Sequence, residues 1–178
     1  FRRLEGNPEY QNLFIDKIEA QDMIQSGTLV VVVDVNNLDF CEAPDVVNTV
    51  QNLVIIDHHR KTAEFKSQPK IAYIEPSASS ASELMSEFLE QILPQGTLPK
   101  VEADLLLAGM LLDTKRFTHN TGVRTFSSAL YLRSEGASPI DAQALFKMNI
   151  EDFLSEAKFE SNVVIYKSVI AIALNDSN

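Results

Sequence analysis

The sequence predicts an α/β domain in which helices flank a parallel sheet, followed by a helical linker and the start of a second α/β domain. Two apolar runs rich in β-branched residues, 28–35 and 53–56, are continuous rather than alternating, which is typical of strands buried on both faces. Helical patterns separate and follow these runs, and the connection between them fits a right-handed crossover. Hydrophobic residues make up 45% of the 178 residues and charged residues 22%, the composition of a folded globular chain.

The expected elements alternate between strands and helices before a purely helical stretch. Pro44 and Pro139 suit the first turns of two helices, and Ser80 with Glu83 matches a capping box ahead of another. In chain order the predictions are a helix over 8–24, a strand over 28–35, a helix over 44–51, strands over 53–56 and 71–74, helices over 79–93, 101–112, 125–134, 138–148 and 151–160, and a single strand over 162–174.

Composition narrows the classes of function. The 25 acidic and 15 basic residues give a net charge of −10, which is poorly suited to holding long DNA or RNA by its phosphates. A small anionic substrate, or a bound cation that offsets the acidic groups, is compatible with this charge. The single Cys41 excludes an internal disulfide and a zinc site built from CxxC pairs, so we expect an intracellular protein. No apolar run reaches the roughly 18 residues of a membrane span.

Carboxylates follow the first two predicted strands. Asp34 ends the first strand, and Asp57 ends the second and is followed at once by His58 and His59. Ligands bind at the carboxyl ends of strands in an open parallel sheet, and carboxylates with imidazoles suit Mn²⁺, Mg²⁺ or Zn²⁺. A lone acid at a strand end is more often a cap, but two such acids with paired histidines favour a metal site. Because neighbours in an extended segment point in opposite directions, we expect the two histidines to divide their roles.

Asp113 closes a strongly apolar helix, where a carboxylate opposes the helix dipole and is costly to desolvate. A positive group should therefore lie near it. Lys115 or Arg116 is the ordinary candidate, and a metal ion is the functional one. With Asp34 and His58, Asp113 would complete a set of carboxylates and imidazole of the kind that binds a divalent metal.

The segment after Asp113 concentrates hydroxyl, basic and glycine residues. Gly122 stands just before a predicted helix and could present backbone amides to an anion, and Arg124 could pair with a phosphate. A polar loop between two helices is the simpler interpretation, and we expect His119 to belong to this loop.

Asp57-His58-His59 at the end of a buried strand resembles the signature of the DHH phosphoesterases. Asp34 in VVVDV and Asp113 in LLAGMLLDTKRF are similar to two further metal-binding motifs of that family, in the same order. The segments IDHHR, YIEPSASSASEL, LLAGMLLDTKRF and TGVRTFSSALYLRSEGA resemble its membrane-anchored cyclic di-AMP phosphodiesterase branch. The resemblance covers nearly the whole chain.

The resemblance implies two-metal hydrolysis of cyclic di-AMP to linear pApA. Asp34 would bridge two divalent ions, for which Mn²⁺ is expected and Mg²⁺ is the alternative, and His58 and Asp113 would complete one coordination shell. His59 would contact the substrate phosphate, and Asp57 would help to orient the histidines.

The same resemblance implies substrate contacts and partners. Arg60, Gly122 and Arg124 would bind the substrate, a small cyclic dinucleotide rather than a long nucleic acid. A homodimer is compatible with the resemblance. We expect a cytoplasmic domain that is anchored to the bacterial cell membrane, in the full protein, by segments outside this chain.

Two features depart from the family pattern. Its first motif, a His with an Asp-x-Asp, is absent, and the segment 36–40, NNLDF, differs from the basic or histidine-containing segment expected after Asp34. We therefore expect a DHH core over 1–137 without its first strand and motif, a helical linker over 138–161, and the start of a truncated substrate-binding domain over 162–178. Such a fragment alone would be nearly inactive and would bind metal weakly. The alternatives are a short-oligoribonucleotide or pAp hydrolase of the same superfamily and a non-catalytic nucleotide-binding module.

Overall fold

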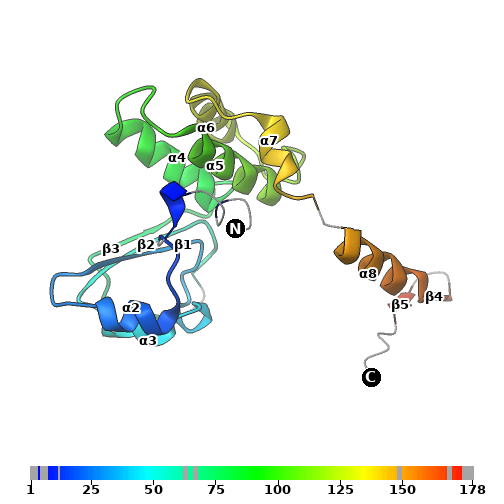
Figure 1. Cartoon of the computed structure of the whole chain (residues 1–178), viewed down its shortest axis with the longest axis horizontal. Coiled ribbons are helices and arrows are strands. Elements are labelled where there is room, and N and C mark those ends of the chain that lie inside the picture. The colour runs from blue at the N-terminus through cyan, green and yellow to red at the C-terminus, as the bar shows by residue number, and fades with distance from the viewer. Residues whose placement is uncertain are drawn as a thin grey trace. The chain divides into compact units, whose positions relative to one another are not determined.

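Three parallel strands in the order β1-β2-β3 form the central sheet of the first part of the chain (Figure 1). The strands are β1 (Leu29–Val33), β2 (Asn52–Asp57) and β3 (Ile71–Ile74), which confirms the predicted parallel sheet. The computed structural model describes residues 4, 8–11, 13–61, 64–65, 68–147, 150–167 and 170–173. The chain divides into two compact units, Phe1–Leu145 and Phe146–Asn178.

Alternate residues of β2 bury against different layers of helices. Leu53 and Ile55 pack with Val47 of α3 (Pro44–Thr49), whereas Ile56 packs with Leu84 of α4 (Ala81–Ile92). Figure 1 shows α3 on one side of the sheet, together with α2 (Lys17–Met23), and α4 on the other. The central strand is therefore covered on both faces, which explains its continuous apolar sequence.

The prediction that β1 is buried on both faces is wrong. Val30 and Val32 pack against the α3 layer, but Val31 and Val33 on the other face are each 46% exposed. The reason is position, because β1 pairs only with β2 in the described sheet and α4 packs over β2 rather than over β1. Apolar continuity in the sequence cannot distinguish an edge strand from a central one.

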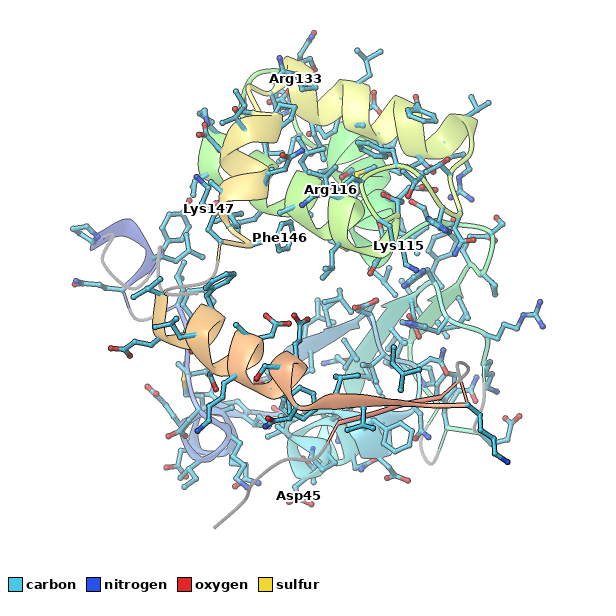
Figure 2. The ribbon with its side chains drawn as sticks, turned by 90° about the vertical axis from the view of Figure 1, so that its right-hand side faces the viewer. Asp45, Lys115, Arg116, Arg133, Phe146 and Lys147 are labelled. Atoms are coloured by element: carbon cyan, nitrogen blue, oxygen red, sulfur yellow. The ribbon has the colours of Figure 1, made fainter. Side chains whose placement is uncertain are left out.

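Four helices form a second layer with its own core. These are α4, α5 (Lys100–Asp113), α6 (Val123–Ser134) and α7 (Pro139–Ala144). Leu107, Met110 and Leu132 are almost completely buried between them. α4 and α5 lie so close together that a Cβ on Gly109 would collide with the hydroxyl of Ser82, which would have to turn away to make room. Figure 2 shows Arg133 of α6 and Asp45 of α3 at opposite ends of the first unit.

The N-terminal helix predicted over 8–24 is shorter in the structure. A 3₁₀ turn, η1 (Pro8–Tyr10), precedes α2, which begins only after Asp16. The Asp16 side chain accepts the backbone N–H groups of Ile18 and Glu19, an N-cap that the apolar spacing did not reveal. The helix predicted over 138–148 likewise ends at Ala144, and its last residue lies outside the described residues.

The second unit contains α8 (Ile150–Ser161) and two antiparallel strands, β4 (Val163–Tyr166) and β5 (Ile170–Ala173). The single strand predicted over 162–174 is therefore wrong within the described residues. Lys167 has a φ of 51°, a left-handed conformation that ends β4. The domain boundaries expected at 137 and 161 stay predictions. No helix in the described part of the chain is long and apolar enough to cross a membrane.

Ser80 is the N-cap of α4, and its hydroxyl accepts the backbone N–H of Glu83 at 3.0 Å. Replacing Ser80 with Ala should lower the free energy of unfolding by about 1 kcal/mol, because one buried amide loses its acceptor. Chemical denaturation of the chain measures this loss. Ser134→Ala, which removes a hydroxyl near the end of α6 that donates to the carbonyl of Tyr131, is the control, and an equal loss in both variants would contradict the capping role.

Candidate metal centre

Asp34 and Asp57 leave the sheet side by side. Asp57 is the last residue of β2, and Asp34 directly follows β1, with its backbone N–H donating to the carbonyl of Ile56 at 3.0 Å. Asp34 has a φ of 67°, a left-handed conformation that costs a residue other than glycine about 1–3 kcal/mol. Strained residues of this kind cluster at functional sites, where the surrounding structure holds a side chain in one direction.

His58 lies between two carboxylates that come from different elements. Its Nε2 is 3.3 Å from Oδ1 of Asp34 and 3.8 Å from Oδ2 of Asp113, at the end of α5. The side chain is 15% exposed, so the ring is held in place but still open to a ligand. The structure thus brings together Asp34, His58 and Asp113, which the sequence placed on a strand end, a following loop and a helix end.

His59 turns to the same side as His58. The two ring centroids are 4.2 Å apart, so the expectation that the histidines point in opposite directions is wrong. The reason is that β2 ends at Asp57 and the alternation of an extended strand no longer applies. Oδ1 of Asp57 accepts the backbone N–H of His59 at 3.1 Å and lies 2.8 Å from its Nδ1. The His59 ring itself is 58% exposed.

The pKa values of two groups in this cluster, His59 and Asp113, are shifted. The hydrogen bond to Asp57 raises the pKa of His59 above its ordinary value, with smaller contributions from the charges of Asp57 and Asp34. Because the pKa is higher in the folded protein, this contact stabilises the fold fully below the ordinary histidine pKa and less as pH rises through the raised value. Burial raises the pKa of Asp113, partly offset by His58.

Asn36 is a positioning residue that the sequence analysis did not identify. It is almost completely buried, and its Nδ2 donates to Oδ2 of Asp57 at 2.6 Å and to the backbone carbonyls of His59 and Arg60 at 3.2 and 3.4 Å. One amide thereby fastens the turn after β1 to the turn after β2. Its position two residues after Asp34 was the available signal, but the sequence does not show where that side chain points.

The donor set fits a divalent metal. One ligand atom each of Asp34, Asp57, His58 and His59 lies within 4.8 Å of the others. Asp57 is fully buried and both its oxygens already accept hydrogen bonds, so it is better placed to orient its neighbours than to bind an ion. Asp34 is exposed, and the ion pairs that join it to described residues involve the histidines alone. A cation bound here would therefore relieve a converging set of carboxylates.

Lys115 and Arg116 do not neutralise Asp113 in the part of the chain that the structure describes. Both are exposed on the turn that follows α5 (Figure 2), and no ion pair joins either of them to Asp113. Three successive residues of this turn, from Lys115 to Phe117, have left-handed φ values between 48° and 63°. Among the described residues, the histidines rather than these two cations face Asp113, and His58 Nε2 is 3.8 Å from its Oδ2.

A polar pocket of about 540 Å³ opens beside the cluster. Arg60 and Gly122 line it together with both histidines and Asp113. The backbone N–H of Gly122 donates to Oγ1 of Thr125 at 3.0 Å, which satisfies that amide within the helix cap. His119 lies in the loop before α6, as expected, with Nδ1 2.8 Å from the hydroxyl of Thr118. The pocket thus gathers polar groups from separate segments of the chain beside the acid–histidine cluster.

Arg124 does not line this pocket. Its Nε and Nη2 donate to the two carboxylate oxygens of Glu87 at 2.8 and 2.7 Å, and this paired contact raises the pKa of the guanidinium. A further contact reaches Oγ of Ser77 at 3.4 Å. Arg124 is thus directed towards α4, and in this structure it meets carboxylates rather than the pocket interior.

A buried carboxylate holds one wall of the pocket. Glu83 is 1% exposed, and its Oε2 accepts both the backbone N–H and the hydroxyl of Ser79, a pocket residue. The predicted capping box is therefore half formed, because Ser80 caps the amide of Glu83 while the Glu83 side chain reaches Ser79 instead of returning to Ser80. This bond ties the loop before α4 to the helix itself.

Replacing Asp57 with Asn should lower the pKa of His59 in metal-free protein towards its ordinary value, because the charged acceptor is lost. Titration of the histidine ring signals by NMR measures the change. Asp34→Asn is the control for a weaker effect. Oδ1 of Asp34 lies 3.9 Å from Nδ1 of His59, so this substitution should lower the pKa of His59 less than Asp57→Asn does. An equal fall in both variants would contradict the assignment of Asp57 as the principal partner.

Comparison with known proteins identifies the family of this chain. The family model "DHH family, N-terminal domain" matches residues 3–110. The chain is 39% identical over 165 residues to the cyclic-di-AMP phosphodiesterase GdpP of Bacillus subtilis, covering 93% of this chain and 25% of that protein. It is 38% identical over 168 residues to the cyclic-di-AMP phosphodiesterase PdeA of Listeria monocytogenes, covering 93% and 26%. The chain thus spans about a quarter of the length of these relatives.

The fold is also similar to that of a solved structure. An exopolyphosphatase-related protein from Bacteroides fragilis superimposes with a TM-score of 0.66 and 24% identity, covering 78% of this chain and 42% of the other. At that identity the likeness shows the fold alone. The family model, by contrast, matches more than half of the chain and includes Asp34, His58 and His59. The chain belongs to the DHH family of phosphoesterases.

Proposed function

We propose that this chain is part of a metal-dependent phosphodiesterase that hydrolyses cyclic di-AMP to linear pApA. The observation that carries the proposal is the cluster of Asp34, His58, His59 and Asp113 at the edge of a polar pocket. Similarity to two cyclic-di-AMP phosphodiesterases over 93% of the chain supports this substrate class. The net charge of −10 favours a small dinucleotide over a nucleic acid polymer.

The cluster would hold part of a site for two divalent ions, for which Mn²⁺ is expected and Mg²⁺ is the alternative. Asp34 would bridge the ions, and His58 and Asp113 would complete one set of ligands. The ions would polarise the phosphoryl group, activate water and neutralise developing charge. Asp57 and Asn36 would keep the ligands in place, since they hold the turn that carries both histidines.

Protein groups would position the phosphate. His59 lines the pocket, and its ring would donate a hydrogen bond to a phosphate oxygen. Arg60 lines the same pocket and can offer two parallel hydrogen bonds to phosphate, and Gly122 permits close approach of the chain. Arg124 would act indirectly, because its bond to Glu87 and its contact with Ser77 support the pocket wall.

The proposal also covers the domain arrangement of the full-length protein. The core would occupy 1–137, joined by a linker over 138–161 to the start of a substrate-binding domain over 162–178. A first family motif and the rest of that second domain would complete the site. We also propose a homodimer on the cytoplasmic side of the bacterial membrane, anchored by segments outside this chain.

In the full-length protein, Asp34→Ala and His58→Ala should each lower Mn²⁺-dependent hydrolysis of cyclic di-AMP by about 100-fold or more, because each removes a metal ligand. The measurement compares cleavage of cyclic di-AMP, cyclic di-GMP, pApA and short RNA. His119→Ala, which changes a histidine outside the cluster, should retain activity.

The substrate pattern decides between the proposal and its alternatives. Preferential cleavage of cyclic di-AMP that both cluster variants abolish would support it. Cleavage of only pApA or short RNA would instead indicate an oligoribonucleotide or pAp hydrolase. No cleavage of any of these substrates with metal present would contradict an enzyme and favour a nucleotide-binding module.

A further inference from the structure

A second hollow borders the acid–histidine cluster, next to the turn that follows β1. It has a volume of about 290 Å³, and its lining includes Asp34, Asp57, Phe40, His59 and Arg60. His59 and Arg60 also line the polar pocket of about 540 Å³. The cluster therefore borders two hollows that share two residues, and a group bound at the cluster has room on either side.

A well-supported turn presents Phe40 to solvent. The turn η2 (Leu38–Phe40) begins at Asn37, whose Oδ1 accepts the backbone N–H of Asp39 at 3.2 Å. The backbone N–H of Phe40 donates to the carbonyl of Asn37 at 3.0 Å, and Leu38 is buried in the core on the α3 side of the sheet. Phe40 itself is 79% exposed. The turn thus anchors one apolar residue and leaves an aromatic ring lining the second hollow.

The two hollows offer different chemistry. Asn120 and Thr121 line the larger pocket, and side chains of these types can donate hydrogen bonds to phosphate and sugar oxygens. The hydroxyls of Ser77 and Ser79, also in its lining, already donate to glutamates but can still accept hydrogen bonds from sugar hydroxyls. The smaller hollow instead contains the ring of Phe40, a flat apolar surface that suits the face of another aromatic group. Stacking on an exposed aromatic side chain is a usual way for proteins to bind an unpaired nucleobase.

Charge also favours a base in the smaller hollow. Two carboxylates, Asp34 and Asp57, line it, and Arg60 is the one Lys or Arg among the described residues that do so. Among the described lining residues, Arg60 alone carries a fixed positive charge that an anionic group could meet, whereas a neutral and planar base needs no such partner. The phosphate attached to the base would still lie beside His59 and Arg60, at the boundary between the two hollows.

We propose that the smaller hollow is a nucleobase subsite in which one base of the substrate stacks on Phe40. The proposal rests on the proposed phosphodiesterase function and adds to it a residue that recognises the base. The scissile phosphate lies at the cluster, and the nucleosides on its two sides occupy the two hollows. Phe40 lies in the same segment as Asn36 and Asn37, which also line this hollow.

Phe40→Ala in the full-length protein should weaken binding of AMP about tenfold, the loss expected for one base–aromatic stack. Binding of ribose 5-phosphate should not change, because that ligand carries the phosphate and sugar without a base. Isothermal titration calorimetry with Mn²⁺ measures both affinities. Phe40→Trp should retain binding of AMP, because it keeps an aromatic face. Ile140→Ala, which truncates a side chain of α7 that is 80% exposed, should leave both affinities unchanged.

The outcomes separate this inference from the function on which it rests. If the unchanged protein binds neither AMP nor ribose 5-phosphate, the nucleotide-binding function fails and the subsite fails with it. If the protein binds both ligands but Phe40→Ala weakens them equally, or leaves AMP binding unchanged, the nucleobase subsite is overturned while the phosphate site stands. Selective loss of AMP binding, retained by Phe40→Trp, supports the subsite.

Discussion

The site depends on the parallel register between β1 and β2. Val33 pairs with Ile56, so the next residue on each strand, Asp34 or Asp57, leaves the sheet at the same edge. A slip of one residue would turn the side chains of a strand to the opposite face and separate the two acids. Burial of β2 between two helical layers disfavours such a slip, because it would expose the apolar residues that now fill both cores. Apolar burial in the sheet thus positions polar groups at its end.

Buried and exposed carboxylates have different roles near the carboxyl ends of β1 and β2. Asp57 and Glu83 are almost completely buried. Asp57 forms hydrogen bonds with Asn36 and His59, and Glu83 accepts one from Ser79. A buried carboxylate that has all its partners makes the groups around it rigid, although it contributes little net stability by itself. Asp34 and Asp113 are more exposed and converge on His58, so these are the groups that can meet a cation. The buried carboxylates thus hold neighbouring groups in place, and the exposed carboxylates are the ones available to a cation.

Local patterns predicted more of the fold than of the site's contacts. The apolar runs located all three strands of the sheet, and their terminal acids indicated where a metal could lie, because parallel strands share one functional edge. The pairing of Arg124 with Glu87 and of Asn36 with Asp57 joins residues distant in sequence, and no local pattern contains such contacts. The helix over 8–24 failed for a related reason. Its apolar residues have helical spacing, but Phe14 and Ile18 stay exposed, so packing does not extend the helix.

In the proposed function, His58 and the surrounding carboxylates bind a divalent metal. Electron spin-echo spectroscopy of Mn²⁺ bound to the full-length protein tests it directly, because a coordinated imidazole nitrogen modulates the manganese signal. We expect nitrogen modulation in the unchanged protein, its weakening or loss in His58→Gln, and its full retention in His119→Gln, whose ring lies outside the cluster. Modulation that is absent from the unchanged protein, or that persists undiminished in His58→Gln, would contradict the claim.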